Sequence, residues 1–165
     1  MERAKSFVSI SDELRAFLES GVSVVVGTRD SELVPEITRA WGPRVGRDRR
    51  SVSLCIALAT SGKALKNLRD NGHLAATFSL PTNYKTIQLK GRCVRTASPN
   101  RQDLAAVEHH RNAFLASTER IGVPRRFTEA LWQRELVEST VMVKIRFMAK
   151  QAFDQSPGPD AGSPL

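Results

Sequence analysis

Ser53-Leu-Cys-Ile-Ala-Leu-Ala-Thr-Ser-Gly-Lys-Ala-Leu-Lys-Asn-Leu68 changes from one hydrophobic period to another within a single stretch. In its first half, Leu54, Ile56 and Leu58 alternate with small or polar residues, the two-residue period of a strand with one buried face. After Thr60 the apolar residues follow the spacing of a helix. The stretch therefore predicts a buried strand that passes directly into a helix.

The junction between strand and helix is Thr60-Ser61-Gly62-Lys63. We expect the Ser61 hydroxyl to cap the helix. Lys63 then lies in the first turn, where a cation opposes the partial positive charge of the helix start. Free backbone N–H groups, two hydroxyls and an ammonium together favour a phosphate site. The alternative is an ordinary capped helix with a solvated lysine.

Length and charge limit the possible classes of protein. The chain has 165 residues, 41% of them hydrophobic, which predicts one folded domain over 1–165. It has no apolar run of roughly 18 residues and no apolar signal segment near Met1, so we predict a cytoplasmic protein. Lys and Arg number 25 against 17 Asp and Glu, a net charge of +8. This favours an anionic partner, either a phosphorylated small molecule, a nucleic acid or another polyanion.

The remaining patterns predict a mainly β chain with flanking helices. Strands are expected at 22–28, 33–41, 53–60, 73–80, 84–96 and 138–153. Helices are expected to open near Ser9, Ser61, Ser98 and Pro124. Residues 1–10 are read as an N-terminal arm. Residues 154–165 are read as a flexible Pro/Gly tail that contributes little to folding.

Several local features refine these elements. Gly91 falls in a long strand where a bulge or barrel bend is expected. In the shorter helix near the C-terminus, Phe127, Leu131 and Trp132 are expected to face the core. His109 lies in the long helix beside His110, but no cluster of carboxylates or thiols accompanies them, so we predict no metal site.

The segment 42–50 is predicted to be a loop that carries four arginines. These arginines could form a basic patch for nucleic acid or phosphate, or simply a solvated hairpin turn. A nucleic-acid-binding barrel ranks lower, because the sequence shows no exposed aromatic pair on adjacent strands for base stacking.

The order of these elements resembles the FMN-binding split barrel of the pyridoxamine 5′-phosphate oxidase-like superfamily. Three short motifs carry the resemblance, at Pro35-Glu-Ile-Thr-Arg-Ala-Trp41, Ala59-Thr-Ser-Gly-Lys-Ala64 and Thr86-Ile-Gln-Leu-Lys-Gly91. They are similar, in this order, to the family's second strand, its phosphate-binding turn and the strand whose polar side chains face the flavin ring. The likeness covers roughly residues 10–150 and implies a six-stranded antiparallel split β-barrel with flanking helices.

The resemblance also implies a cofactor, a partner and a site. The cofactor would be FMN, with a deazaflavin coenzyme as a possibility, bound between the subunits of a homodimer. The implied cofactor-binding residues are Arg39, Trp41, Thr60, Ser61, Lys63, Thr86 and Gln88. Arg39 and Lys63 would bind the phosphate, while Trp41 would offer a flat apolar wall to the ring.

Two departures from the family pattern bear on activity. Gly62 stands where the family has a phosphate-binding arginine, and Arg146 has no histidine two residues later, so the substrate motif of true pyridoxamine phosphate oxidases is missing. We therefore expect a flavin-dependent oxidoreductase with another substrate, and we assign no acid, base or nucleophile. The alternative is a non-catalytic split barrel that binds flavin or haem.

Overall fold

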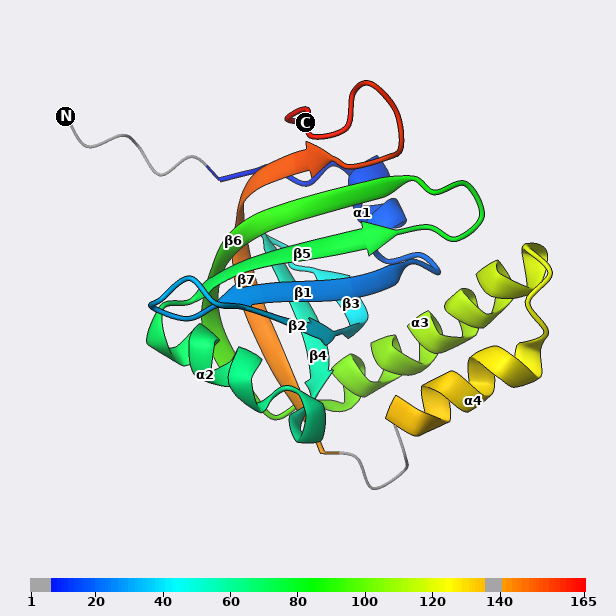
Figure 1. The fold of residues 1–165 in the computed structure, drawn as a ribbon, viewed down its shortest axis with the longest axis horizontal. Coiled ribbons are helices and arrows are strands. Elements are labelled where there is room, and N and C mark those ends of the chain that lie inside the picture. Colours follow the sequence, from blue (N-terminus) through cyan, green and yellow to red (C-terminus); the bar gives the residue numbers. More distant parts are fainter. Residues whose placement is uncertain (1–6, 136–140) are drawn as a thin grey trace.

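The computed structural model describes residues 7–135 and 141–165, which form one curled antiparallel sheet with helices around it (Figure 1). The strands of this part of the chain are β1 (Ser23–Arg29), β2 (Pro35–Arg39), β3 (Trp41–Val45), β4 (Ser51–Ala57), β5 (His73–Ser79), β6 (Thr86–Ala97) and β7 (Met142–Asp154). Its α-helices are α1 (Asp12–Leu18), α2 (Gly62–Asp70), α3 (Arg101–Arg120) and α4 (Arg125–Glu135).

The sheet is a barrel that is split between its two edge strands. Its strand order is β2-β1-β5-β6-β7-β4-β3, and every pair of neighbours is antiparallel. The edges β2 and β3 are consecutive in sequence, and only Ala40 separates them. The sheet must therefore curl until its edges meet at Ala40, whose N–H donates to the carbonyl of Val24 at 3.1 Å. The predicted antiparallel split barrel with flanking helices is confirmed.

The predicted number of strands was wrong, because the described residues hold seven and not six. The expected strand 33–41 divides at Ala40, and the expected loop 42–50 contains most of β3. Gly42 and Pro43 hid this strand from sequence analysis. Pro43 is tolerated there because β3 is an edge, where a missing N–H need not break a ladder bond.

The predicted passage from strand to helix exists, but a short turn interrupts it. β4 ends at Ala57, and a 3₁₀ turn over Leu58–Thr60 precedes α2. The alternating pattern therefore stops one step early, and Leu58 is exposed instead of buried. At Gly91 the expected bulge is confirmed by a register shift between β6 and β7. A Cβ there would lie 2.1 Å from the carbonyl oxygen of Met148, so the close approach requires glycine.

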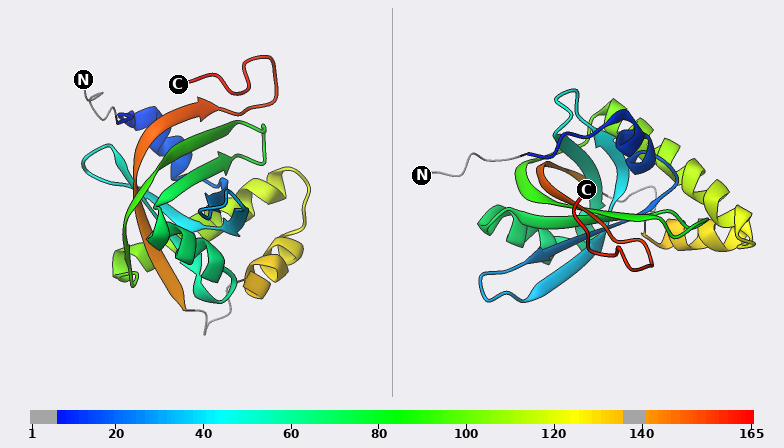
Figure 2. Two further views of the ribbon diagram at one scale, coloured as in Figure 1. Left: turned by 60° about the vertical axis from the view of Figure 1, so that its left-hand side comes forward. Right: turned by 90° about the horizontal axis from the view of Figure 1, so that it is seen from above.

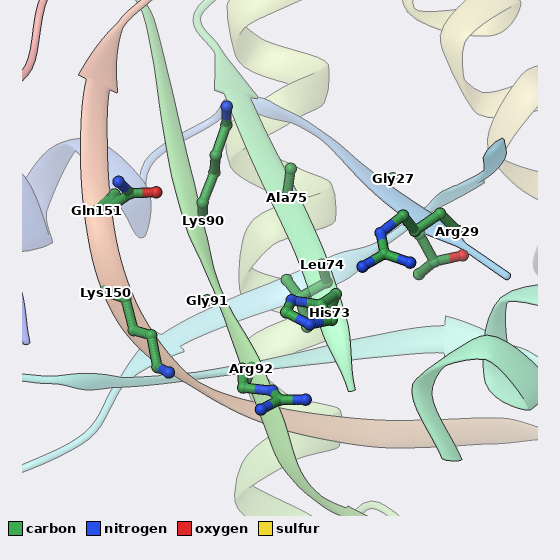
Figure 3. A pocket seen from close by; sticks show the side chains of 11 residues that line it. Gly27, Arg29, His73, Leu74, Ala75, Lys90, Gly91, Arg92, Lys150 and Gln151 are labelled. Carbon is green, nitrogen blue, oxygen red and sulfur yellow. The ribbon is translucent and has the colours of Figure 1, made fainter. Parts of the chain in front are cut away.

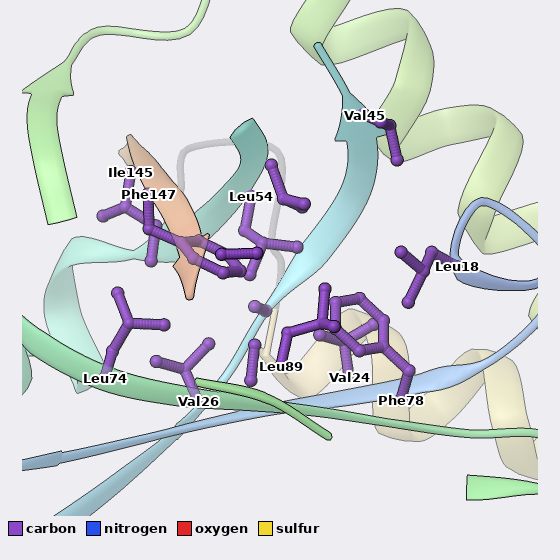
Figure 4. Packing of buried hydrophobic residues seen from close by; sticks show 14 of the residues in the cluster. Leu18, Val24, Val26, Val45, Leu54, Leu74, Phe78, Leu89, Ile145 and Phe147 are labelled. Atoms are coloured by element: carbon purple, nitrogen blue, oxygen red, sulfur yellow. The ribbon is translucent and has the colours of Figure 1, made fainter. Parts of the chain in front are cut away.

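The main core fills the barrel interior with aliphatic side chains and two phenylalanines (Figure 4). It includes the fully buried Val26 of β1, Leu54 of β4, Phe78 of β5, Leu89 of β6 and Phe147 of β7. Along β1 and β5 the buried side chains alternate with less buried ones, as a single buried sheet face requires, whereas β4 is buried on both faces. Burial of this apolar surface is the main stabilising contribution to the fold.

A smaller cluster lies between β3, β4 and the pair α3–α4, which run side by side at one flank of the barrel (Figures 1 and 2). It joins Trp41, Cys55, Val107 and Trp132. Trp132 faces inward as predicted, but the prediction for its neighbours was wrong. Phe127 and Leu131 are exposed, because α4 packs against the rest of the molecule along a narrow stripe.

Both described ends of the chain return to the barrel. Val8 and Ile10 donate backbone hydrogen bonds to Ala149 and Arg49. At the other end, the segment after β7 folds back, so that Leu165 donates to the carbonyl of Ala152 and Gln155 donates to that of Thr86. These tail contacts lie at the surface, and the last nine residues are all exposed.

Candidate functional site

A concavity of about 180 Å³ lies where β2, β3, β4 and the 3₁₀ turn meet. Its lining residues are Ile37, Thr38, Arg39, Trp41, Ala57 and Thr60. Three of the seven predicted cofactor-binding residues, Arg39, Trp41 and Thr60, therefore come together although they lie on separate elements. Curling of the sheet brings them together, because it sets the edge strand β2 beside the end of β4.

Ser61 lies directly behind this concavity, but its predicted capping role was wrong. Its hydroxyl makes no capping bond to α2 and instead lies 2.6 Å from the hydroxyl of Thr38 on β2. Only 1% of Ser61 is exposed, so this buried contact fixes the start of α2 against the sheet. The first turn of α2 thus has no side-chain cap, and its N–H groups have no acceptor within the helix.

The space in front of α2 is open. No heavy atom would lie within 4 Å of a Cβ at Gly62, apart from its own neighbours. Lys63 follows in the first turn, and its side chain is exposed to solvent. Arg39 is exposed as well and already takes part in an interaction in this structure. Lys63 follows the concavity in sequence but is not among the residues that line it.

Trp41 is placed differently from the expected flat wall. Its side chain is only 6% exposed and packs on Trp132, with the ring centroids 4.1 Å apart and the planes tilted by 57°. Trp41 is therefore part of the smaller core and also lines the concavity.

Thr86 and Gln88 lie on β6, away from the other predicted residues. Gln88 donates to the Thr77 hydroxyl at 3.0 Å, and Thr86 donates to or accepts from the Ser79 hydroxyl at the same distance. In the ladder Gln88 lies opposite Thr77, which lies opposite Val25. Val25 in turn lies opposite Arg39, so Gln88 and Arg39 are three strand spacings apart, roughly 14 Å.

A larger concavity was not predicted from the sequence. It measures about 510 Å³ and lies on the outer face of the sheet over β1, β5, β6 and β7. Its basic residues come from four separate strands, and each is an ordinary solvated charge when the sequence is read alone. Among residues 7–135 and 141–165, no three potential metal ligands come together.

The sequence has no match among curated proteins, and no protein-family model matches it. The structure does match known ones. HupZ of Group A Streptococcus superposes with a TM-score of 0.53 at 18% identity, covering 93% of this chain and 99% of that one. The chain therefore has the same split-barrel fold as this solved structure.

Two further neighbours show the same architecture. An F420 reductase has a TM-score of 0.57 at 10% identity, covering 87% of this chain and 98% of that one. A candidate pyridoxamine 5′-phosphate oxidase from Lactobacillus delbrueckii has a TM-score of 0.52 at 8% identity, covering 92% and 97%. At such identities the likeness concerns the fold alone. In the described part of the chain, no helix has the length and apolar character needed to cross a membrane.

Proposed function

We propose that this split-barrel protein binds FMN and acts as a flavin-dependent oxidoreductase on a substrate other than pyridoxamine phosphate. The observation that carries the proposal is the joining of the small concavity to the uncapped, open start of α2. Two cations and a helix N-terminus beside one opening suit a phosphate dianion. That the neighbours include an F420 reductase and a candidate pyridoxamine 5′-phosphate oxidase supports a flavin-type cofactor.

The residues have separate roles in this proposal. Lys63 and the first N–H groups of α2 bind the phosphate, and Arg39 adds a second charge-assisted bond. The Thr60 hydroxyl donates to the same phosphate, while Ser61 acts from behind by holding α2 against β2. FMN, once bound, supplies the redox chemistry, and the chain orients it and excludes water.

The size of the concavity argues for a second copy of the chain. At about 180 Å³ it is smaller than the roughly 300–1,000 Å³ of usual small-molecule sites. Thr86 and Gln88 lie too far from Arg39 to share one small pocket within a protomer. In a homodimer, the outer face that carries Gln88 would close the concavity of the partner. Light scattering should show a dimer at micromolar concentration, and a monomer would contradict this arrangement.

Removal of Lys63 tests the phosphate site. Lys63→Ala should weaken FMN binding about ten- to a hundredfold, because a charge-assisted hydrogen bond contributes about 1.5–3 kcal/mol. Lys66→Ala is the matched control, since Lys66 lies on the same helix and pairs with Asp70. Riboflavin lacks the phosphate and should bind wild type and Lys63→Ala equally weakly. Equal FMN affinity in wild type and Lys63→Ala would show that the phosphate lies elsewhere.

A non-catalytic flavin- or haem-binding protein is the second candidate. It is favoured by the lining of the concavity, which offers no group that titrates near neutral pH, and by Gly62 in place of a phosphate-binding arginine. The absorbance of the purified protein separates flavin, deazaflavin and haem. Reduction of the bound flavin by a nicotinamide donor, followed by reoxidation with turnover, supports the oxidoreductase. Tight binding without such turnover supports the alternative. The cytoplasmic location stays a prediction.

A further inference from the structure

The larger concavity gathers basic side chains from four strands (Figure 3). Arg29 stands at the end of β1, His73 at the start of β5, Lys90 and Arg92 on β6, and Lys150 on β7. Figure 3 shows the guanidinium groups of Arg29 and Arg92 on either side of the His73 ring, with Lys150 extending towards Arg92. No acidic residue is among those that line the concavity.

These charges are not neutralised by the chain itself. Arg29 donates to the carbonyl of Asp30 and Arg92 to that of Asn71, contacts that orient each group without cancelling its charge. Within residues 7–135 and 141–165, no carboxylate forms an ion pair with Arg29, Arg92 or Lys150. Burial lowers the pKa of His73, and the nearby charges of Arg92, Arg29 and Lys150 lower it further.

The floor of the concavity is made of small residues. Gly27 and Ala75 are cross-strand partners on β1 and β5, and Gly91 continues the floor on β6. At Gly27 a Cβ would meet only the Ala75 carbonyl oxygen, 3.8 Å away, so the floor is open there. A ligand can therefore approach the backbone closely, and the long basic side chains surround it from the rim. The shape is that of a shallow cradle of about 510 Å³ with positive walls.

We propose that this cradle is a second anion-binding site, and that it takes a small ligand with a diphosphate group. Four permanent cations and an imidazole around one cavity suit a group that carries more than one negative charge. A diphosphate presents many acceptor oxygens, and each arginine can donate to two of them. The site lies apart from the start of α2 in the same protomer, but it shares the outer face with Gln88, so the FMN measurement below separates the two sites.

The first test uses inorganic pyrophosphate and NMR of the imidazole carbon signals. The His73 signal is assigned by its loss in His73→Gln. Pyrophosphate should shift this signal and raise the pKa of His73, because a nearby anion favours the imidazolium. Binding should tighten as pH falls, while the signal of the exposed His109 serves as an internal control and stays unchanged. A His73 signal that does not respond to millimolar pyrophosphate overturns the proposal.

The second test compares two double variants that remove the same charge. Arg92→Gln/Lys150→Gln should weaken pyrophosphate binding about tenfold or more, the effect of losing at least one charge-assisted bond. Arg120→Gln/Arg126→Gln, on α3 and α4 far from the cradle, should change it by less than about twofold. An equal loss in both double variants would mean general attraction to a basic surface and would overturn a defined site.

Other probes define the ligand class. Inorganic phosphate and citrate should bind at least about tenfold more weakly than pyrophosphate, and citrate of equal affinity would overturn the diphosphate assignment. A short oligonucleotide that shifts the His73 signal where pyrophosphate does not would point to nucleic acid instead. FMN affinity should be equal in wild type and Arg92→Gln/Lys150→Gln. A similar loss of FMN affinity in this double variant would show that the cradle is part of the flavin site and would overturn a second site. If FMN does not bind wild type at all, the proposed FMN site is wrong, but the pyrophosphate test still decides on the cradle.

Discussion

Two groups of basic side chains in this barrel differ in what surrounds them. On the flank next to α3, Arg44 and Lys144 both donate to the carboxylate of Asp103, at 2.8 and 2.9 Å. On the outer face, Arg92 and Lys150 lie near His73 with no carboxylate in the cradle. Asp103 is almost fully buried, with 2% of its side chain exposed, whereas the cradle is open to solvent.

The first group of cations stabilises a buried carboxylate of the chain itself. The second group has no carboxylate partner in the cradle and can bind a ligand. Burial raises the pKa of Asp103, but hydrogen bonds from the Asn100 backbone and from Lys144 and Arg44 outweigh it and keep the pKa below its usual range. The pair of cations there compensates a buried anion, which would otherwise be very costly. The cradle cations compensate nothing within the described chain. The net charge of +8 therefore indicates an anion-binding surface only through those cations that have no carboxylate partner.

The largest effect is expected at the buried carboxylate. Asp103→Ala leaves Arg44 and Lys144 without their counter-charge and removes the capping-box contact to Asn100. We expect a loss of roughly 3–4 kcal/mol in the free energy of unfolding, at the lower end for broken buried pairs because both cations stay partly exposed. Urea denaturation measures it. Asp160→Ala, in the exposed tail, should change stability by less than about 0.5 kcal/mol, and similar values for both variants would remove the distinction.

The buried His110 lies on α3, the helix that also carries Asp103, and should make the free energy of unfolding depend on pH. His110 accepts from the Gly42 N–H and lies 2.7 Å from the Val22 carbonyl, so its Nδ1 is the acceptor and its Nε2 carries the proton. Burial lowers the pKa of His110 to about 4, and nearby His109 lowers it slightly. The unfolded chain therefore binds the proton first as pH falls below about 6.5.

Stability should consequently be full above pH 6.5 and fall by roughly 2–3 kcal/mol as pH drops towards 4. Urea unfolding at several pH values in this window measures the slope. The lowered pKa values of Asp48 and Asp103 begin to reduce stability as pH approaches their unfolded value of 3.8, so most of their effect lies below the window. His110→Gln should be less stable at neutral pH but nearly flat over the same range. A variant with the wild-type slope would assign the effect to another group.

Removal of the tail, residues 154–165, shows whether surface hydrogen bonds stabilise the fold as much as buried contacts do. The tail makes several backbone hydrogen bonds, yet its last nine residues are all exposed. Truncation after Phe153 should therefore leave the melting temperature nearly unchanged. A fall of more than about 4 °C, the scale of one kcal/mol or more for a chain of this length, would show that the tail is a structural part of the barrel.

The smallest stability effect is expected in the cradle. Arg92→Gln and Lys150→Gln should each change the free energy of unfolding by less than about 0.5 kcal/mol, since neither charge is paired with a carboxylate. Removal of one like charge from the group can even stabilise slightly. The measurement is the same urea denaturation as for Asp103→Ala. A loss near that of Asp103→Ala would make the cradle cations structural and would break the comparison.

Local patterns in the sequence were sufficient for much of the fold. The period change near Thr60 predicted a strand followed by a helix, and Gly91 predicted a bulge, because both signals depend on neighbours along the chain. The same local logic failed at Leu58 and Ser61. Ser61 has the side chain of a helix cap, but a hydroxyl from β2 lies 2.6 Å away, and this contact replaces the cap. No pattern within the α2 segment could reveal that partner.

The candidate site, like the fold, was predicted from the sequence only in part. The sequence by itself determined an antiparallel split barrel, and it singled out Arg39, Thr60 and Lys63 through motifs that are contiguous in the chain. Only the tertiary structure decided that Trp41 is mostly buried against Trp132 and that basic residues from four strands form one cradle. The physical reason is that hydrophobic periodicity reports which face of an element is buried, whereas contacts between distant elements depend on sheet curvature and strand register.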